Sequence, residues 1–142
     1  MRKTWQWWER VTDFAPPVGF LLHPDAPLHD TGWRHPEHQG RLRALASTVG
    51  RDLLALHDKV VQVEPGRVTE EDLLRVHTPE YLALLRAHVD RAEKEDAPVP
   101  LDADTIVSGA SWAAATGSTA ALLTAVEQVA SGTLSSAFVA TR

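Results

Sequence analysis

Short apolar runs alternate along the chain with longer stretches that have a helical repeat. The apolar runs lie at 19–22, 60–63 and 137–140. None of them alternates strictly between apolar and polar positions, and a run that is apolar on both faces is typical of a strand covered by helices on both sides. The pattern therefore predicts three strands of a buried sheet.

Helical periodicity fills the intervals between these runs. Residues 37–56 place apolar side chains every three or four positions, which predicts an amphipathic helix. Thr69, with Asp72 three positions on, is a capping-box-like start for a short helix that ends near His77. Strands alternating with helices indicate the α/β class, with a parallel sheet and helices on both faces.

Two further helices are predicted in the second half of the chain. Thr78 before Pro79 matches an N-cap followed by proline at the first helical position, and opens a helix to about residue 92. The charged, proline-containing segment 93–100 predicts a loop. The helix at 110–131 carries large apolar residues on one face and small residues on the other, so we expect other elements to pack closely on both sides.

Composition and charge exclude several classes of protein. The 142 residues are 44% hydrophobic and 23% charged, as in ordinary globular domains, and the net charge of -5 gives no bulk electrostatic reason to bind nucleic acid. The absence of cysteine excludes disulfides and thiolate metal ligands within the chain and fits a cytoplasmic protein. Residues 1–18 form a tryptophan-rich extension without the features of a secretion signal. Polar residues within 111–130 disfavour a membrane span.

Candidate chemistry is concentrated in the long loop after the first predicted strand. Residues 23–36 are rich in His, Asp and Pro, and ligands of open parallel sheets lie beyond the carboxyl ends of the strands. The side chains of metal-ligating type in and beside this loop are His23, Asp25, His29, His35, Glu37 and His38. Their spacing does not match a helical His-Glu-x-x-His motif, so an ordinary loop is favoured over a local metal site.

Several segments, in order, resemble one known family. The run from His35 to Arg41, His-Pro-Glu-His-Gln-Gly-Arg, is similar to the His-Pro-Glu-x-Pro-x-Arg pattern of the histone deacetylase and acetylpolyamine amidohydrolase family, with Gln39 in place of the usual proline. Bacterial class II-like members are the most similar, and the resemblance covers about residues 19–142. The other matching segments are 29–32, 75–82, 101–112 and 137–142, the last resembling the strand that leads into Arg-Pro-Pro-Gly-His-His.

The resemblance implies an arginase/deacetylase-type fold with one zinc ion and the hydrolysis of an acetyl amide in acetyl-lysine or an acetylpolyamine. It implies that the zinc ligands, the histidine pair and the tyrosine that act in the family follow Arg142. We therefore assign no catalytic residue and no metal ligand in this chain. Residues 19–142 are interpreted as the N-terminal part of a deacetylase domain, truncated before the Pro-Pro-Gly-His-His segment, and the chain alone is predicted to be inactive.

The resemblance also assigns residues to a pocket and a substrate rim. Arg41 matches the family arginine beside an internal channel, while an ion pair with Glu37 at the helix start is an alternative, compatible role. Asp104 lies near the substrate-binding rim position, with Asp102 as its neighbouring alternative; an aspartate that closes its own turn is the other interpretation. For His35, a buried imidazole bonded to backbone is favoured. The remaining residues expected to line or support the pocket are His29, Trp33 and Pro36.

The expected partners are an acetylated lysine or polyamine and the missing C-terminal part of the domain. No nucleic acid or membrane is expected, and a homo-oligomer is left open. Two alternatives remain. One is a non-catalytic α/β binding or scaffolding domain, and the other is a small metal hydrolase that uses the loop at 23–38.

Overall fold

Three parallel strands form the centre of the protein in the computed structural model, which describes residues 15–56 and 59–142. They are β1 (Val18–Leu21), β2 (Val60–Gln62) and β5 (Ser136–Val139), in the order β2-β1-β5. The predicted parallel sheet is confirmed, with each strand shifted or shortened by one residue. Most of the predicted extension at 1–18 lies outside the described residues.

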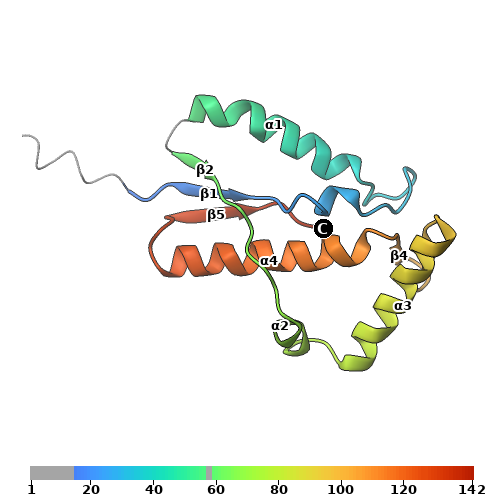
Figure 1. Cartoon of the computed structure of the whole chain (residues 1–142). Coiled ribbons are helices and arrows are strands. Elements are labelled where there is room, and N and C mark those ends of the chain that lie inside the picture. The colour runs from blue at the N-terminus through green and yellow to red at the C-terminus, as the bar shows by residue number, and fades with distance from the viewer. Residues whose placement is uncertain (1–14, 57–58) are drawn as a thin grey trace, which may run out of the picture.

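Helices cover both faces of this sheet, as predicted. Figure 1 shows α1 (Gly40–Leu56) above the strands and α4 (Ser111–Ala130) below them. Neighbouring residues of β1 explain the arrangement, because successive side chains of a strand point to opposite faces. Phe20 packs in a cluster with Leu42 of α1, whereas Leu21 is fully buried and packs with Ala121 of α4. Both faces of β1 are apolar because one packs against α1 and the other against α4.

The two faces of α4 differ sharply in burial. Its small residues, among them Ala121 and Ala125, face the sheet and are buried. Because these side chains are small, the helix backbone approaches the sheet closely. Its large residues differ along the helix: Trp112 packs against α3, whereas Leu122 is 54% exposed and Val126 is 59% exposed. The expectation that both faces are closely packed therefore holds at Trp112 and is wrong farther along the large-residue face, around Leu122 and Val126.

The predicted caps of the two middle helices are confirmed. Helix α2 (Glu70–Leu74) begins with a capping box, in which the Thr69 hydroxyl accepts from Asp72 N at 3.2 Å and the Asp72 carboxylate accepts from Thr69 N at 3.0 Å. Helix α3 (Pro79–Glu95) has Thr78 as its N-cap. These caps satisfy backbone N–H groups that the first turn of a helix leaves without partners.

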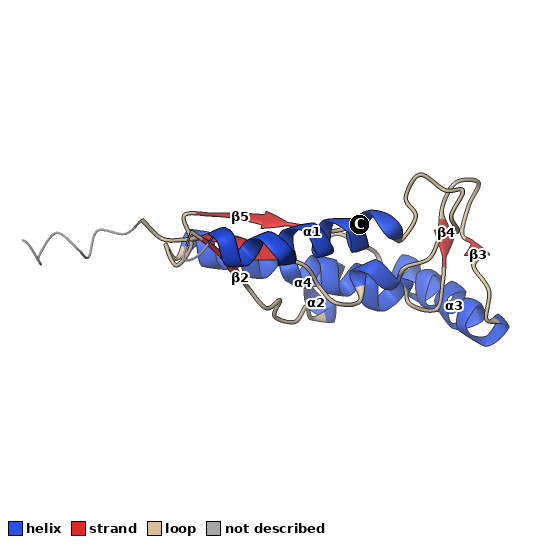
Figure 2. Ribbon diagram, turned by 90° about the horizontal axis from the view of Figure 1, so that it is seen from above, coloured by secondary structure: helices blue, strands red, loops and turns tan. Residues whose placement is uncertain are grey.

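The loop predicted at 93–100 is wrong at both ends. Helix α3 continues to Glu95 and ends at Asp96, which adopts the left-handed conformation with φ of 50°. The strands β3 (Val99–Pro100) and β4 (Ile106–Val107) then form an antiparallel hairpin, which Figure 2 shows beside α3. Val99 and Val107 are buried against α3, so tertiary packing extends structure into a segment whose local composition favours a loop.

The first residues predicted to belong to α1 form turns instead. Helix α1 begins at Gly40 rather than at Glu37. Before it, the Nδ1 atoms of His35 and His38 accept hydrogen bonds from the backbone N–H groups of Glu37 and Gly40, at 3.1 and 3.2 Å. These local side-chain acceptors satisfy the backbone in a non-helical conformation, which delays the start of the helix.

Candidate functional site

The loops that follow β1 and β5 meet beyond the carboxyl ends of these strands. We call residues 23–39 the first rim loop, which includes the 3-10 helix η2 (Ala26–Leu28). We call residues 101–110 the second rim loop, which includes the short strand β4. Ala140 N donates to Leu21 O at 2.8 Å, which carries the pairing of β1 and β5 into the loops. Arg142 then reaches the first rim loop, where its Nη1 donates to His29 O at 2.6 Å. This is the end of the sheet at which a ligand is expected.

A charged cluster lies at this junction. Glu37 forms an ion pair with Arg41, as the alternative interpretation of Arg41 predicts, and its Oε2 is 4.0 Å from Nε of Arg142. The Arg142 side chain is only 4% exposed, and its Nε has no hydrogen-bond partner within the described residues. The Glu37 carboxylate thus faces two guanidinium groups, and Asp30 also acts electrostatically on Arg142. The unpartnered Nε of Arg142 is complementary to an anionic acceptor.

His29 connects the first rim loop to the start of α4. Its Nδ1 is 2.6 Å from Oγ of Ser111, and the next residue, Asp30, donates its backbone N–H to Oγ of Ser108 at 3.1 Å. Burial lowers the pKa of His29 below its ordinary value, and the charge of Arg142 lowers this pKa further. Both effects favour the neutral form of the His29 imidazole.

The other predicted residues of the first rim loop lie farther out. For His35, the favoured prediction is a buried imidazole bonded to backbone. Its Nδ1 does accept from the backbone, but its side chain is only half-buried. Trp33 is 69% exposed and packs on His38 with 5.2 Å between the ring centroids, and Pro36 is exposed. Gly40 allows this ring pair, because a Cβ there would lie 2.9 Å from the His38 ring. The structure brings Glu37 and Arg41 together and joins His29 to the same cluster through Arg142. His35 acts electrostatically on His29, whereas Trp33 and Pro36 lie at the exposed periphery.

The two rim aspartates have different surroundings in the turn between β3 and β4. Asp102 Oδ1 accepts from Thr105 N at 2.7 Å and from Asp104 N at 3.1 Å. Hydrogen bonding by Thr105, and then by Asp104, lowers the pKa of Asp102. Asp102 is therefore the residue whose carboxylate accepts the backbone bonds that close the turn, and the exposed Asp104 contacts it through its backbone N–H and its side chain.

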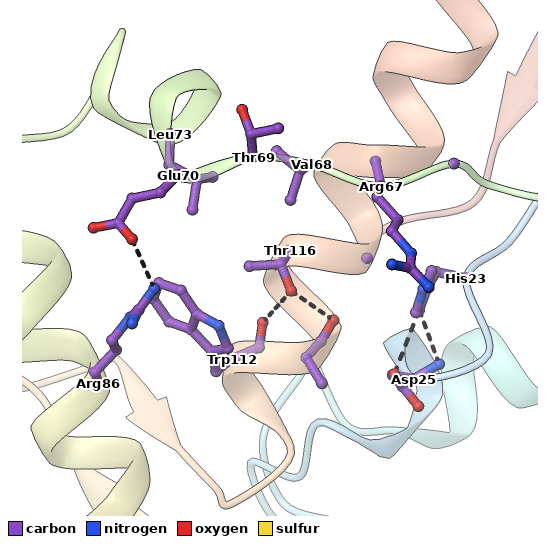
Figure 3. Close-up of a pocket in the computed structure, with 14 residues that line it drawn as sticks. His23, Asp25, Arg67, Val68, Thr69, Glu70, Leu73, Arg86, Trp112 and Thr116 are labelled. Atoms are coloured by element: carbon purple, nitrogen blue, oxygen red, sulfur yellow. Dashed lines mark hydrogen bonds and ion pairs between the residues drawn. The ribbon is translucent and has the colours of Figure 1, made fainter.

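A separate cavity of about 290 Å³ lies between α4, Arg86 of α3 and the segment 66–73 (Figure 3). Its charged groups largely face one another. Arg86 stacks on Trp112, 4.2 Å from the ring centroid, and approaches Glu70 to 3.7 Å, while His23 Nδ1 is 3.7 Å from the carboxylate of Asp25. None of the predicted pocket or rim residues lines this cavity, so we place the candidate site at the junction of the strand ends.

Metal-ligating side chains do not converge in the part of the chain that the structure describes. No group of three His, Asp or Glu side chains is arranged there to hold a metal ion. His23 and His29 instead bond to the loop and to Ser111, and His35 and His38 cap turns of the backbone. Each of these imidazoles therefore has a structural contact of its own.

Sequence reasoning did not identify Thr31, Ser108, Ser111 or Arg142 as contact residues of the site. Thr31 donates to Glu37 O at 2.9 Å and lies 3.4 Å from Nη2 of Arg142. A usable signal was present for the serines, because two serines three positions apart at a helix start are typical of side chains that bond to the backbone there.

Comparisons with a family model, with curated proteins and with solved structures agree. Residues 35–142 match the model of the histone deacetylase domain. A probable deacetylase of Archaeoglobus fulgidus is 29% identical over 68 residues, which are 48% of this chain and 19% of that protein. The crystal structure of an HDA15 HD domain superposes with a TM-score of 0.76 and 18% identity over 91% of this chain and 36% of the other. The chain thus spans about a fifth of the curated relative and about a third of the solved structure.

Within the described residues, no helix combines the length and the apolar character needed to cross a bilayer.

Proposed function

Because this chain belongs to the histone deacetylase family, we propose that it is part of a zinc-dependent deacetylase that hydrolyses the acetyl amide of acetyl-lysine or of an acetylpolyamine. In this proposal residues 19–142 are the N-terminal part of the domain and supply its pocket and substrate rim rather than its catalytic centre. We further propose that the protein acts in the cytoplasm and binds neither nucleic acid nor membrane.

The observation that carries the proposal is the charged cluster at the strand ends. Hydrolysis of an acetyl amide releases acetate, and a planar guanidinium recognises a carboxylate through two parallel hydrogen bonds. Arg41 and Arg142 both approach the carboxylate of Glu37, and Nε of Arg142 is a buried donor without a hydrogen-bond partner among the described residues, which suits a carboxylate acceptor. This arrangement supports a role for Arg41 in holding or guiding the acetate product.

The described residues contain no group of side chains arranged to bind zinc. We therefore propose that the zinc ligands and the acid–base residues lie in polypeptide that follows Arg142. No chemical step is assigned to a residue of this chain, and the chain by itself is expected to be inactive. Its contribution is to bind and orient the substrate and to receive the product.

Exposed apolar side chains support the proposal that more polypeptide packs on this part of the domain. Leu122 and Val126 of α4 and Phe138 of β5 are each more than half exposed. Soluble monomers rarely leave clusters of large apolar side chains uncovered. A self-contained scaffolding domain would be expected to cover them, so the competing function is disfavoured, whereas the rest of a deacetylase domain or a second copy of the chain would bury them.

Two experiments test the proposed function. The DNA that follows the codon of Arg142 is expected to encode a segment similar to Pro-Pro-Gly-His-His. The polypeptide that includes it is expected to hydrolyse an acetyl-lysine peptide or N-acetylputrescine when zinc is present, whereas the 142-residue chain with zinc is expected to do neither. Hydrolysis by the 142-residue chain alone, or inactivity of the longer polypeptide loaded with zinc, would contradict the proposal.

A matched pair of variants tests the role of Arg41 in the active polypeptide. Arg41→Gln is expected to weaken inhibition of this polypeptide by added acetate by about tenfold or more, and so to raise its activity in the presence of acetate, because a charged hydrogen-bond partner of the product is lost. Arg43→Gln serves as the control, since this residue is also exposed and lies in the same turn of α1. Equal inhibition of the two variants by acetate would contradict a role for Arg41.

A further inference from the structure

The two rim loops are joined by a buried set of hydrogen bonds centred on two serines. Ser108 is 9% exposed and Ser111 is 7% exposed. Ser111 Oγ accepts from Ser108 N at 2.7 Å and lies 2.6 Å from Nδ1 of His29. Ser108 Oγ accepts from Asp30 N at 3.1 Å and lies 3.3 Å from Oγ of Ser111. Segments about eighty residues apart in sequence therefore meet through two hydroxyl groups.

Counting donors and acceptors gives this set a direction. Each serine hydroxyl has one hydrogen to donate and two lone pairs. Ser108 Oγ accepts from Asp30 N, so its own hydrogen is free to reach Ser111 Oγ. Ser111 Oγ then accepts from Ser108 N and Ser108 Oγ and donates its hydrogen to His29. Every polar hydrogen in the set finds an acceptor only if Nδ1 of His29 carries no proton.

The opposite direction leaves one group without a partner. If Nδ1 of His29 carries a proton, it donates to Ser111 Oγ, and the Ser111 hydrogen turns toward Ser108 Oγ. The Ser108 hydroxyl then accepts two bonds, and the hydrogen that it carries has no acceptor among the described contacts. An unpaired buried donor is costly, so the neutral tautomer of His29 that carries its proton on Nε2 is favoured.

We propose that Ser108 and Ser111 are positioning residues that fix the first rim loop against the second through the neutral Nε2–H tautomer of His29. Because Arg142 holds the same loop from the other side, the substrate rim and the charged cluster are set as one unit. Their role as a substrate rim rests on the proposed function, but the connection between the loops does not.

The connection is sensitive to the protonation of His29, because a charged imidazole must donate from Nδ1. The charged and titratable groups that act on His29 come from two parts of the chain, the first rim loop and Arg142 after β5. Asp30 and Glu37 favour its protonated form, whereas burial, Arg142 and His35 favour its neutral form. The balance lowers the pKa of His29, which agrees with a network that needs the neutral ring.

The first test uses the unmodified chain. A long-range ¹H–¹⁵N spectrum of the imidazoles reports which ring nitrogen carries the proton. At pH 7.5 we expect an unprotonated Nδ1 for His29, together with slow hydrogen exchange at the backbone amide of Asp30. A protonated Nδ1, or an Asp30 amide that exchanges as fast as a solvent-exposed amide, would overturn the proposal.

The second test compares two buried serines of α4. Ser111→Ala is expected to speed exchange at the Asp30 amide by about tenfold and to raise the pKa of His29, whereas Ser111→Thr keeps a hydroxyl and is expected to retain the wild-type tautomer. Ser118→Ala is the matched control, because Ser118 is 8% exposed and its Oγ has no hydrogen-bond partner in the described chain. Identical behaviour of Ser111→Ala and Ser118→Ala would overturn the proposal.

Activity provides a separate readout. A longer polypeptide that keeps the His29 tautomer and the protected Asp30 amide but hydrolyses no acetyl amide would contradict the proposed function and leave the loop connection in place. If the longer polypeptide is active but Ser111→Ala changes neither the His29 tautomer nor the exchange of the Asp30 amide, the loop connection is contradicted and the proposed function is kept.

Discussion

The guanidinium of Arg142 donates a hydrogen bond of 2.6 Å to the backbone carbonyl of His29, 113 residues earlier in the chain. The contact is possible because β1 and β5 are adjacent parallel strands whose carboxyl ends lie at the same edge of the sheet. Arg142 is almost fully buried there and has the backbone of the first rim loop as its main partner. We therefore expect Arg142 to stabilise this loop as well as to contribute charge.

Arg142→Gln is expected to destabilise the chain by about 2 kcal/mol, the range for hydrogen bonds that involve a charged group. The measurement is the free energy of unfolding in urea. Arg75→Gln is the control, because the Arg75 side chain is 69% exposed and its ion pairs are 3.8 and 3.9 Å long, so its loss is expected to cost less than about 0.5 kcal/mol. Equal losses in the two variants would contradict the anchoring role of Arg142.

A glycine inside α4 makes room for an imidazole. A Cβ on Gly117 would lie 2.2 Å from Nδ1 of His23, whereas a Cβ on Gly50 in α1 would meet nothing within 4 Å. Gly117→Ala is expected to lower stability by about 1–2 kcal/mol, because the ring must move and lose its contact with the Asp25 backbone. Gly50→Ala is expected to raise stability by up to about 1 kcal/mol through helix propensity. Urea midpoints of the same sign for both variants would contradict this account.

The lowered pKa of His29 predicts a pH dependence of stability. The ordinary value is 6.5, and the folded value lies below it, so the unfolded chain binds the proton first. The contribution of His29 is therefore fully present above pH 6.5 and is lost as the pH falls from 6.5 through the folded pKa. Unfolding free energies at pH 7.5 and 5.5 measure this loss. His29→Asn, which replaces Nδ1 with an amide oxygen, is expected to flatten the slope, and an unchanged slope would rule out His29 as its source.

The sequence could predict those parts of the fold that depend on local patterns. The apolar run around Phe20 and Leu21 specifies a strand covered on both faces, and the pairs Thr69 with Asp72 and Thr78 with Pro79 specify helix starts. Each of these signals acts within a few residues, so it can be recognised without knowledge of the rest of the chain.

The parts that could not be predicted depend on distant contacts. The hairpin at Val99 forms because α3 offers it an apolar surface, and the exposed face around Val126 depends on which elements are present to cover it. At the candidate site, the pair of Glu37 with Arg41 follows from spacing. The contacts of Arg142 and Ser111 with His29 arise only when strands and loops far apart in sequence are brought together.

The turn of the second rim loop separates a structural aspartate from a candidate substrate ligand. Asp102→Ala removes the acceptor of two backbone N–H groups. We therefore expect a lower midpoint of thermal unfolding and faster hydrogen exchange at the Thr105 amide. Asp104→Ala keeps these two backbone bonds and is expected to change the midpoint and the exchange less than Asp102→Ala does. In the polypeptide that hydrolyses acetyl amides, Asp104→Ala is expected to raise KM for an acetyl-lysine peptide more than it lowers kcat, since a rim carboxylate binds the substrate without taking part in the reaction. A KM left unchanged by Asp104→Ala, together with a raised KM in a thermally stable Asp102→Ala variant, would move the substrate-binding role to Asp102.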